Sequence, residues 1–224
     1  MELKIQGLTK TYPNGTQALK GVSLTIGTGL FGLLGPNGAG KSSLMRTIAT
    51  LQPADAGSIL LDSIDVIHQP DEMRKCLGYL PQEFGVYPNV PAEQLLDHLA
   101  VLKGIVHSGE RKELVQHLLQ QTNLFEHRQK AVSGYSGGMR QRFGIAQALI
   151  GNPKLIIVDE PTAGLDPAER NRFLNLLSEI SEQIIIIFST HIVEDVKQLC
   201  NRMAIIQKGS VLFEGTPDEA IQQV

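Results

Sequence analysis

The amino-acid sequence predicts an α/β protein: a mostly parallel core sheet with an N-terminal antiparallel β part and a mostly helical insert. Short, continuously apolar segments alternate with amphipathic helical patterns, as expected for a parallel sheet covered on both faces. Residues 2–12 and 22–26 instead alternate between apolar and polar side chains on either side of an Asn14-Gly15 turn, which predicts antiparallel strands. Residues 91–121 show a helical pattern.

The elements of the core follow from the same patterns. The apolar segment 30–35 predicts a buried strand, and residues 41–51 predict the helix that follows it. Residues 58–66 predict a further strand, and the apolar runs at 154–160 and 183–190 predict two more. The C-terminal part adds a helix at 167–180, a hairpin at 203–215 and a short closing helix.

The insert is expected to contain one helix at 91–102 and another at 109–121, with Ser108 as the predicted N-cap of the second. The next helical pattern, which starts after Ser136, has an apolar face that favours packing in a core. We therefore expect a single domain, which divides as follows. Residues 1–83 and 152–224 form the α/β core, and residues 84–151 form a helical subdomain.

Composition excludes several classes of protein. The net charge of −3 and the absence of a Lys/Arg run disfavour a nucleic-acid partner. The longest apolar run, at 184–188, is far shorter than the roughly 18 residues that a membrane span needs. Cys76 and Cys200 are too few for a disulfide framework, and the N-terminus has no signal pattern. We expect a soluble, intracellular chain.

Residues 35–42, "GPNGAGKS", fit the phosphate-binding pattern G-x-x-x-x-G-K-[ST]. The pattern follows a predicted strand and opens a predicted helix, so backbone N–H groups and the helix dipole favour an anion there. Lys41 can reach the β- and γ-phosphates, and the Ser42 hydroxyl can bind Mg²⁺. A merely flexible turn is the alternative. The predicted nucleotide contacts in this segment are Gly35, Asn37, Gly38, Ala39, Gly40, Lys41, Ser42 and Ser43.

A second candidate site lies where the strand "LIIVDE" ends, at Asp159 and Glu160. The carboxyl end of a parallel strand lies beside a phosphate loop at the same sheet edge. Successive strand residues point in opposite directions, so the two acids are expected to differ in role. We assign Asp159 to the Mg²⁺ shell through water, and Glu160 to the attacking water as general base.

The segment "YSGGM", residues 135–139, is harder to explain as structure alone. Ser136 is a good N-cap. Gly137 and Gly138, however, lower the stability of the helix that follows, by roughly 1 kcal/mol each at interior positions.

Phosphate loop, acid pair and "SGG" segment together resemble the ATP-binding subunit of ABC transporters, over the whole chain and in the family's order. "YSGGM" is similar to the family signature L-S-G-G-Q, with Tyr135 and Met139 as departures. Further positions match the family's aromatic that stacks on adenine, its Q-loop glutamine, its D-loop and its switch histidine: Tyr12, Gln82, Gly164, Leu165, Asp166 and His191.

The resemblance implies an ATP hydrolase that uses ATP and Mg²⁺. It implies a head-to-tail dimer with a second copy or a homologous subunit, in which Ser136, Gly137 and Gly138 cover the ATP held by the partner's phosphate loop. Missing Cβ atoms would permit close approach to the γ-phosphate. A membrane-spanning permease subunit would hold the chain at the inner face of the cell membrane.

The resemblance also implies individual roles, each with a simpler alternative. Gln82 would contact Mg²⁺ or the γ-phosphate, or is an ordinary turn residue. His191 would bond the γ-phosphate and support Glu160, whereas a lone loop histidine usually has no function. Tyr12 would stack on adenine, or pack across strands. Asp166 would both act in the D-loop and cap the helix that begins at Pro167.

"YSGGM" and "PQEFGVYPNV" look like the drug- and peptide-export branch, and the chain ends without the regulatory domain of many sugar importers. A soluble ABC ATPase acting on nucleic acid or the ribosome would carry a coiled-coil insert or a second cassette. A regulator that binds ATP without hydrolysis would lack a base, but Glu160 and His191 are present. Phe84, Val86 and Tyr87 are expected to line a groove for a cytoplasmic helix of the permease, or to pack within the insert.

Overall fold

The structure is a computed structural model that describes residues 1–82, 85 and 88–222. Its strands are β1 (Glu2–Thr11), β2 (Gln17–Gly27), β3 (Gly29–Leu34), β4 (Ala56–Leu61), β5 (Ile64–Asp65), β6 (Leu77–Leu80), β7 (Leu155–Asp159), β8 (Ile185–Thr190), β9 (Arg202–Gln207) and β10 (Ser210–Gly215). Its α-helices are α1 (Lys41–Ile48), α2 (Pro70–Lys75), α3 (Ala92–Leu102), α4 (Ser108–Gln121), α5 (Gly137–Ala148), α6 (Pro167–Ile180), α7 (Val193–Leu199) and α8 (Pro217–Gln222).

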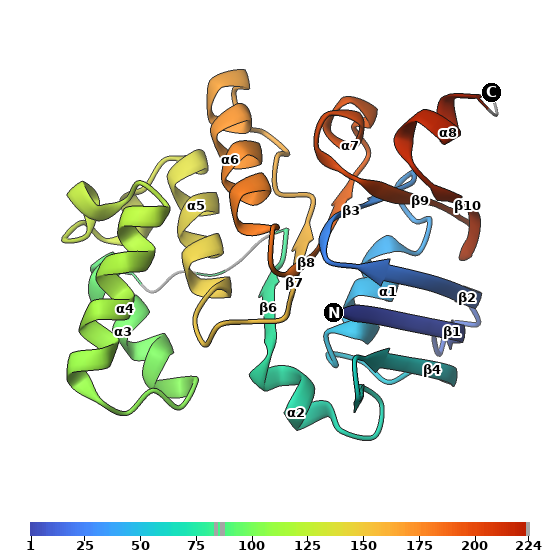
Figure 1. The fold of residues 1–224 in the computed structure, drawn as a ribbon, viewed down its shortest axis with the longest axis horizontal. Helices are drawn as coiled ribbons and strands as arrows, with labels where there is room; N and C mark the ends of the chain where they lie inside the picture. Colours follow the sequence, from blue (N-terminus) through green and yellow to red (C-terminus); the bar gives the residue numbers. More distant parts are fainter. Residues whose placement is uncertain (83–84, 86–87, 223–224) are drawn as a thin grey trace.

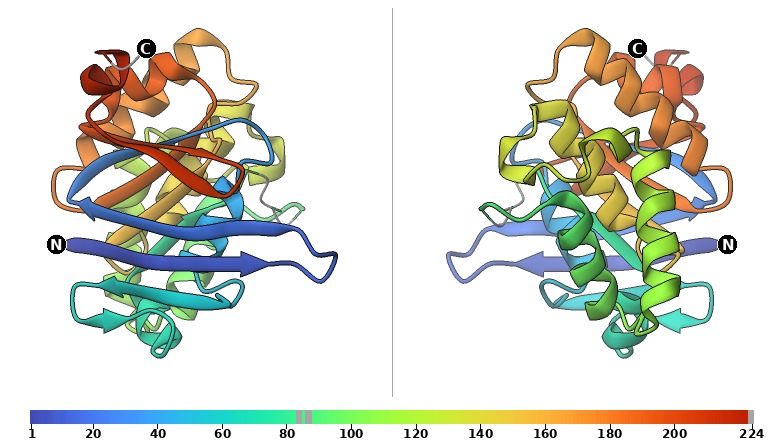
Figure 2. Two further views of the ribbon diagram at one scale, coloured as in Figure 1. Left: turned by 90° about the vertical axis from the view of Figure 1, so that its right-hand side faces the viewer. Right: turned by 90° about the vertical axis from the view of Figure 1, so that its left-hand side faces the viewer.

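The strands form two sheets. One is antiparallel, with the order β2-β1-β4-β5, and the other has the order β10-β9-β3-β8-β7-β6. In the second sheet β9, β3, β8, β7 and β6 run parallel, and β10 pairs antiparallel with β9. The antiparallel sheet and the helices α3 and α4 lie at opposite ends of the molecule (Figures 1 and 2). The predicted fold class is confirmed.

Alternation along the central strands divides the core into two layers. Ile157 and Ile187 face α1, which packs between the two sheets. Ile156 and Ile186 face the other side, where they pack with α6 and α7. These strands are buried on both faces, which explains why their sequences are continuously apolar.

The helical region has its own hydrophobic cluster, built from α3, α4 and α5. Phe143 of α5 lies in this cluster, while Ile145 packs against the core sheet, so α5 joins the two regions. Tyr135 packs edge-on against Phe143 with 6.3 Å between ring centroids, and its hydroxyl donates to the His127 carbonyl at 2.9 Å. The division at residues 84–151 stays a prediction. Every helix in the described part of the chain is too short or too polar to span a lipid bilayer.

Several predicted boundaries were wrong. Ser108 is not the N-cap of α4 but its first residue, because the extended residue is His107, whose side chain makes no capping bond. The strand predicted at 58–66 is broken at Asp62, and the helix predicted at 41–51 ends at Ile48, shortly before Thr50; both Asp62 and Thr50 have left-handed backbones. Phe84, Val86 and Tyr87 lie outside the described residues.

Candidate functional site

The phosphate-loop segment connects β3 to α1 and lines a cleft of about 620 Å³. The cleft is lined by Tyr12, Thr16, Gln17, Ala18, Lys20, residues 36–43, Gln82, Glu160, Lys208 and Gly209. Its size is in the range of clefts that hold small ligands and cofactors. The fold therefore brings the loop together with three residues predicted from distant parts of the sequence: Tyr12, Gln82 and Glu160.

Two ionisable side chains that line this cleft, Lys41 and Glu160, form a cluster with His191. Lys41 is 5% exposed, and its Nζ donates to the Gly35 carbonyl at 2.6 Å. The same Nζ lies 3.3 Å from Glu160 Oε1, and Glu160 Oε2 lies 3.3 Å from His191 Nδ1. One carboxylate thus bridges the cation of the phosphate loop and the histidine that follows β8. This arrangement places a carboxylate, which can accept a proton, beside Lys41 of the loop.

Ser189 of β8 orients the acid pair and was not identified from the sequence. Its hydroxyl donates to Asp159 Oδ1 at 2.6 Å, and the backbone N–H of Glu160 donates to the same hydroxyl oxygen at 3.0 Å. Glu160 has a φ of 44°, which is unusual for a residue with a side chain and costs energy. The turn directs Glu160 toward Lys41 and His191, while Asp159 stays buried against Ser189. The two acids therefore have different surroundings.

The phosphate loop is braced by the β9–β10 turn. Gly209 N–H donates to the Ala39 carbonyl at 2.8 Å. Gly40, the N-cap of α1, has a φ of 113°, and a Cβ atom added there would lie 2.6 Å from the Ala18 carbonyl oxygen. Lys20 and Lys208 also line the cleft. Neither was predicted from the sequence, because neither belongs to a motif.

Tyr12 is fixed in the wall of the cleft by its hydroxyl group. This group donates to Gln52 Oε1 at 3.1 Å and lies 3.0 Å from the Ser43 Oγ atom. Because the phenol hydrogen points to Gln52, the Ser43 hydroxyl is the donor in the second bond. The ring is thereby held at the cleft, in a position suited to contact a flat base.

The "SGG" segment lies elsewhere, since Ser136, Gly137 and Gly138 do not line the cleft. Ser136 is the N-cap of α5, and its Oγ accepts from the Met139 N–H at 3.3 Å, as predicted. A Cβ atom on Gly138 would lie 2.0 Å from Glu169 Oε2, whereas one on Gly137 would meet only Leu165, at 3.5 Å.

Glu169 fills the space left by Gly138 because two arginines hold it there. Its carboxylate pairs with Arg142 of α5, and its other oxygen accepts from Arg172 Nη1 at 2.8 Å. Asp166 caps α6 by accepting from the Glu169 N–H at 2.9 Å, as predicted. Asp166 and Ser136 are exposed and are separate from the cleft.

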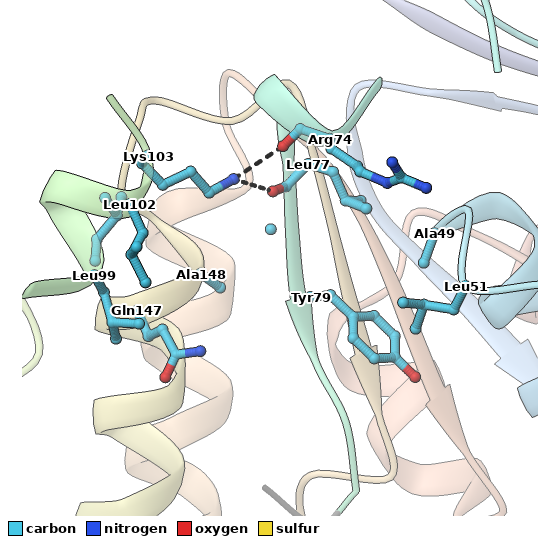
Figure 3. Close-up of a pocket in the computed structure, with 12 residues that line it drawn as sticks. Ala49, Leu51, Arg74, Leu77, Tyr79, Leu99, Leu102, Lys103, Gln147 and Ala148 are labelled. Carbon is cyan, nitrogen blue, oxygen red and sulfur yellow. Dashed lines mark hydrogen bonds between the residues drawn. The ribbon is translucent and has the colours of Figure 1, made fainter. Parts of the chain in front are cut away.

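A second cavity, of about 420 Å³, lies between the core and the helical region (Figure 3). Leu51, Tyr79, Leu99 and Leu102 give it apolar walls. Lys103 Nζ donates to the carbonyls of Arg74 and Leu77, at 3.0 and 2.9 Å (Figure 3). Burial lowers the pKa of Lys103 and raises the pKa of the Tyr79 phenol.

The sequence matches the ABC transporter family profile over residues 19–163. The linearmycin resistance ATP-binding protein LnrL of Bacillus subtilis is 35% identical over 216 residues, which are 96% of this chain and 69% of LnrL.

Solved structures agree with the sequence comparison. The cbiO1 protein of Clostridium perfringens, part of the ABC transporter complex cbiONQ, superposes with a TM-score of 0.90, at 28% identity, over 99% of this chain and 90% of its own. The ATP-binding cassette MJ0796, solved as a post-hydrolysis dimer with ADP and Pi, gives 0.85 at 27% identity, over 96% and 98%. The chain belongs to the ABC transporter family, as one of its ATPase subunits.

Proposed function

We propose that the chain binds and hydrolyses ATP to drive a separate membrane-spanning transporter subunit, through ATP-driven head-to-tail dimerisation. One observation carries the proposal. The chain holds a cleft with Lys41 and Glu160, the latter in contact with His191, and it exposes Ser136 and Gly137, at the start of its signature helix α5, on a different surface. A second subunit would bring that exposed surface to the cleft. That the related cassette MJ0796 has been solved as a dimer bound to ADP and Pi supports dimerisation.

The chain's own side chains suit phosphate-ester hydrolysis. Lys41 would bind the β- and γ-phosphates in place of its present carbonyl contact. Glu160 would accept the proton of the attacking water, and His191 would hold Glu160 and the γ-phosphate in position.

The donor groups at the cleft also fit Mg²⁺, which prefers oxygen ligands and keeps several waters. Ser42 and Gln82 offer a hydroxyl and an amide oxygen there, and Asp159 would bind through water. Among the residues that the structure describes, no group of three or more His, Cys, Asp or Glu side chains is placed to hold a metal ion, so protein ligands of Mg²⁺ would have to include Ser42 and Gln82. When bound, Mg²⁺ would neutralise charge on the phosphates.

The N-terminus of α5 would offer a hydroxyl donor and a helix dipole to the γ-phosphate in the partner's cleft. Ser136 Oγ already accepts from Met139, so its own hydrogen is free to donate to a phosphate oxygen. The N-terminus of α5 adds a favourable dipole. Asp166, exposed at the start of α6, would contact the partner beside this site.

Export is the direction we propose. LnrL is named for resistance to linearmycin, and removal of a toxic compound from the cell is one way to confer resistance. The net charge of −3 gives no support to a nucleic-acid partner. The Lys41–Glu160–His191 cluster argues against a regulator that does not hydrolyse ATP.

The apolar cavity of Figure 3 is the surface we propose for the permease, which would hold the chain at the inner face of the membrane. Its charged lining residues, Arg74 and Lys103, are both cationic. They suit an apolar helix that carries an acidic side chain. Leu102 is 70% exposed at this cavity, and Val106, which does not line it, is 78% exposed.

Two experiments test the proposal. Glu160→Gln should slow hydrolysis about 100-fold or more while ATP still binds, and ATP should then convert the variant to a dimer in sedimentation. Near-normal turnover would exclude Glu160 as the base. Leu102→Glu should abolish coupled transport but leave the isolated ATPase intact, whereas the control Val106→Glu should change neither. Equal effects of the two would exclude the cavity as the docking surface.

A further inference from the structure

We infer that Asp195 is a positioning residue, which holds the loop that carries His191 against the loop that carries Glu160. The inference rests on the proposed hydrolysis by Glu160 and His191. Asp195 carries a buried carboxylate and lies outside both the phosphate loop and the "YSGGM" segment.

Asp195 is the most buried acidic side chain near the cleft. It lies in the first turn of α7, is 1% exposed, and is the salt-bridge partner of Arg170 in α6. Arg170 Nε donates to Asp195 Oδ1 at 2.7 Å, and Thr162 Oγ1 donates to Asp195 Oδ2 at 3.1 Å. Both oxygens of the carboxylate are therefore occupied by groups from other segments.

The three members of this network each lie close in sequence to a site residue. Thr162 follows Glu160 in the loop after β7, and Asp195 follows His191 after β8. Arg170 lies in the first turn of α6, where its N–H donates to the carbonyl of the cap residue Asp166 at 2.9 Å. The carboxylate of Asp195 thus connects α7, the first turn of α6 and the loop after β7 at one buried point.

The histidine loop has few other supports. His191 is 54% exposed, and α7 starts without a side-chain cap, because its N-cap residue is Ile192. The Ile192 N–H donates to Thr190 Oγ1 at 3.0 Å, which fixes the backbone only locally. Ser189 joins the two strand ends through Asp159 and Glu160. Beyond these bonds, Asp195 holds the start of α7 to Thr162 and Arg170, and His191 Nδ1 lies 3.3 Å from Glu160 Oε2. Small displacements of catalytic groups cost large factors in rate.

Asp195→Asn tests this role because it removes the charge and keeps the shape. We expect turnover at saturating ATP to fall about 10- to 100-fold, with the dissociation constant for ATP unchanged. The measurement that separates positioning from folding is the same substitution in a His191→Ala background, by single-turnover hydrolysis. There Asp195→Asn should slow hydrolysis less than about twofold, because no histidine is left to misplace.

Equal slowing in both backgrounds would overturn the inference, as would unchanged turnover in Asp195→Asn. Thr162→Val is a milder variant that removes one hydrogen bond and leaves the ion pair; it should show a smaller loss with the same dependence on His191. It also keeps the test valid if Asp195→Asn does not fold. Asp97→Asn, which breaks the Asp97–Arg111 pair in the helical region, is the matched control and should leave turnover unchanged.

Discussion

Two helices of this protein have glycines at their N-termini, and the reasons differ. At α1, Gly40 has a left-handed backbone, and its missing Cβ makes room for the Ala18 carbonyl. At α5, neither Gly137 nor Gly138 has a positive φ. Gly138 makes room for Glu169, but a Cβ atom on Gly137 would meet Leu165 only at an ordinary contact distance of 3.5 Å. The chain itself thus requires Gly40 and Gly138 but not Gly137.

This difference bears on whether the surface that faces each helix N-terminus belongs to the same chain or to a partner. The α1 glycines shape a cleft that one chain builds alone. Gly137 is exposed and is the first residue of α5, and no contact among the described residues requires a glycine there. The proposed head-to-tail dimer would explain it, because a glycine lets a partner's nucleotide approach closely.

Gly40→Ala should have the largest effect. A side chain there combines a left-handed backbone with a contact of 2.6 Å to the Ala18 carbonyl oxygen. We expect the free energy of unfolding to fall by about 2 kcal/mol or more, together with loss of ATP binding. Denaturant unfolding and ATP titration measure both. Wild-type stability would show that the loop does not need this conformation.

Gly137→Ala should do the opposite at the other helix. Stability should stay the same or rise by up to about 1 kcal/mol, because alanine favours the helix. ATP binding to the single chain should be unchanged, but hydrolysis should be lost. If turnover stays normal, close approach of a partner at Gly137 is not needed.

Gly138→Ala should give a smaller loss of stability, about 1–3 kcal/mol, because the added methyl displaces Glu169. In a Glu169→Ala background the same substitution should cost much less. A double-mutant cycle of unfolding free energies measures this coupling. Additive effects would show that Glu169 is not what fills the space.

Two substitutions of Tyr12, in the wall of the cleft, should show the smallest difference. Tyr12→Ala should cost about 1–3 kcal/mol of ATP affinity if the ring stacks on the base. Tyr12→Phe keeps the ring but loses the bonds to Ser43 and Gln52, so it should cost about 1 kcal/mol or less. Calorimetry compares the two. Equal losses would assign the effect to the hydroxyl group.

Much of the fold follows from the sequence. Burial on both faces makes β7 and β8 mainly apolar, and burial of one face makes α6 amphipathic. Helix α2 and strand β6 were not predicted. Six residues with only Met73 buried give no helical period, and β6 is a four-residue strand. A Cβ atom on Gly78 of β6 would lie 2.3 Å from the Ala148 carbonyl oxygen of α5. Because α5 is distant in sequence, no local pattern predicts this glycine.

The same limit holds at the site. The phosphate-loop motif and the acid pair at the end of an apolar strand are patterns of neighbouring residues, so both could be identified in the sequence. Ser189, Arg170 and Asp195 act through contacts with residues 25 or more positions away, which no local pattern reveals. The left-handed backbone of Glu160 is likewise held by its own N–H, which donates to Ser189 Oγ of β8.

If each ATP site is shared by two chains, two inactive variants with defects in different parts of the site should complement each other when mixed. Lys41→Ala removes the cation of the phosphate loop, and Ser136→Arg places a long side chain at the start of α5. Each variant alone should be nearly inactive. In a mixed dimer, one site combines both defects, and the other joins the intact loop of one chain to the intact signature helix of the other.

We predict that mixing restores ATP hydrolysis, with up to about half of the dimers carrying one complete site if pairing is random. ATP binding to the mixture should be measured beside turnover, because strict cooperativity between the sites could mask hydrolysis. Formation of mixed dimers should be shown by differently tagged chains. If neither binding nor hydrolysis recovers in dimers shown to be mixed, the signature helix acts within its own chain and the head-to-tail account is wrong.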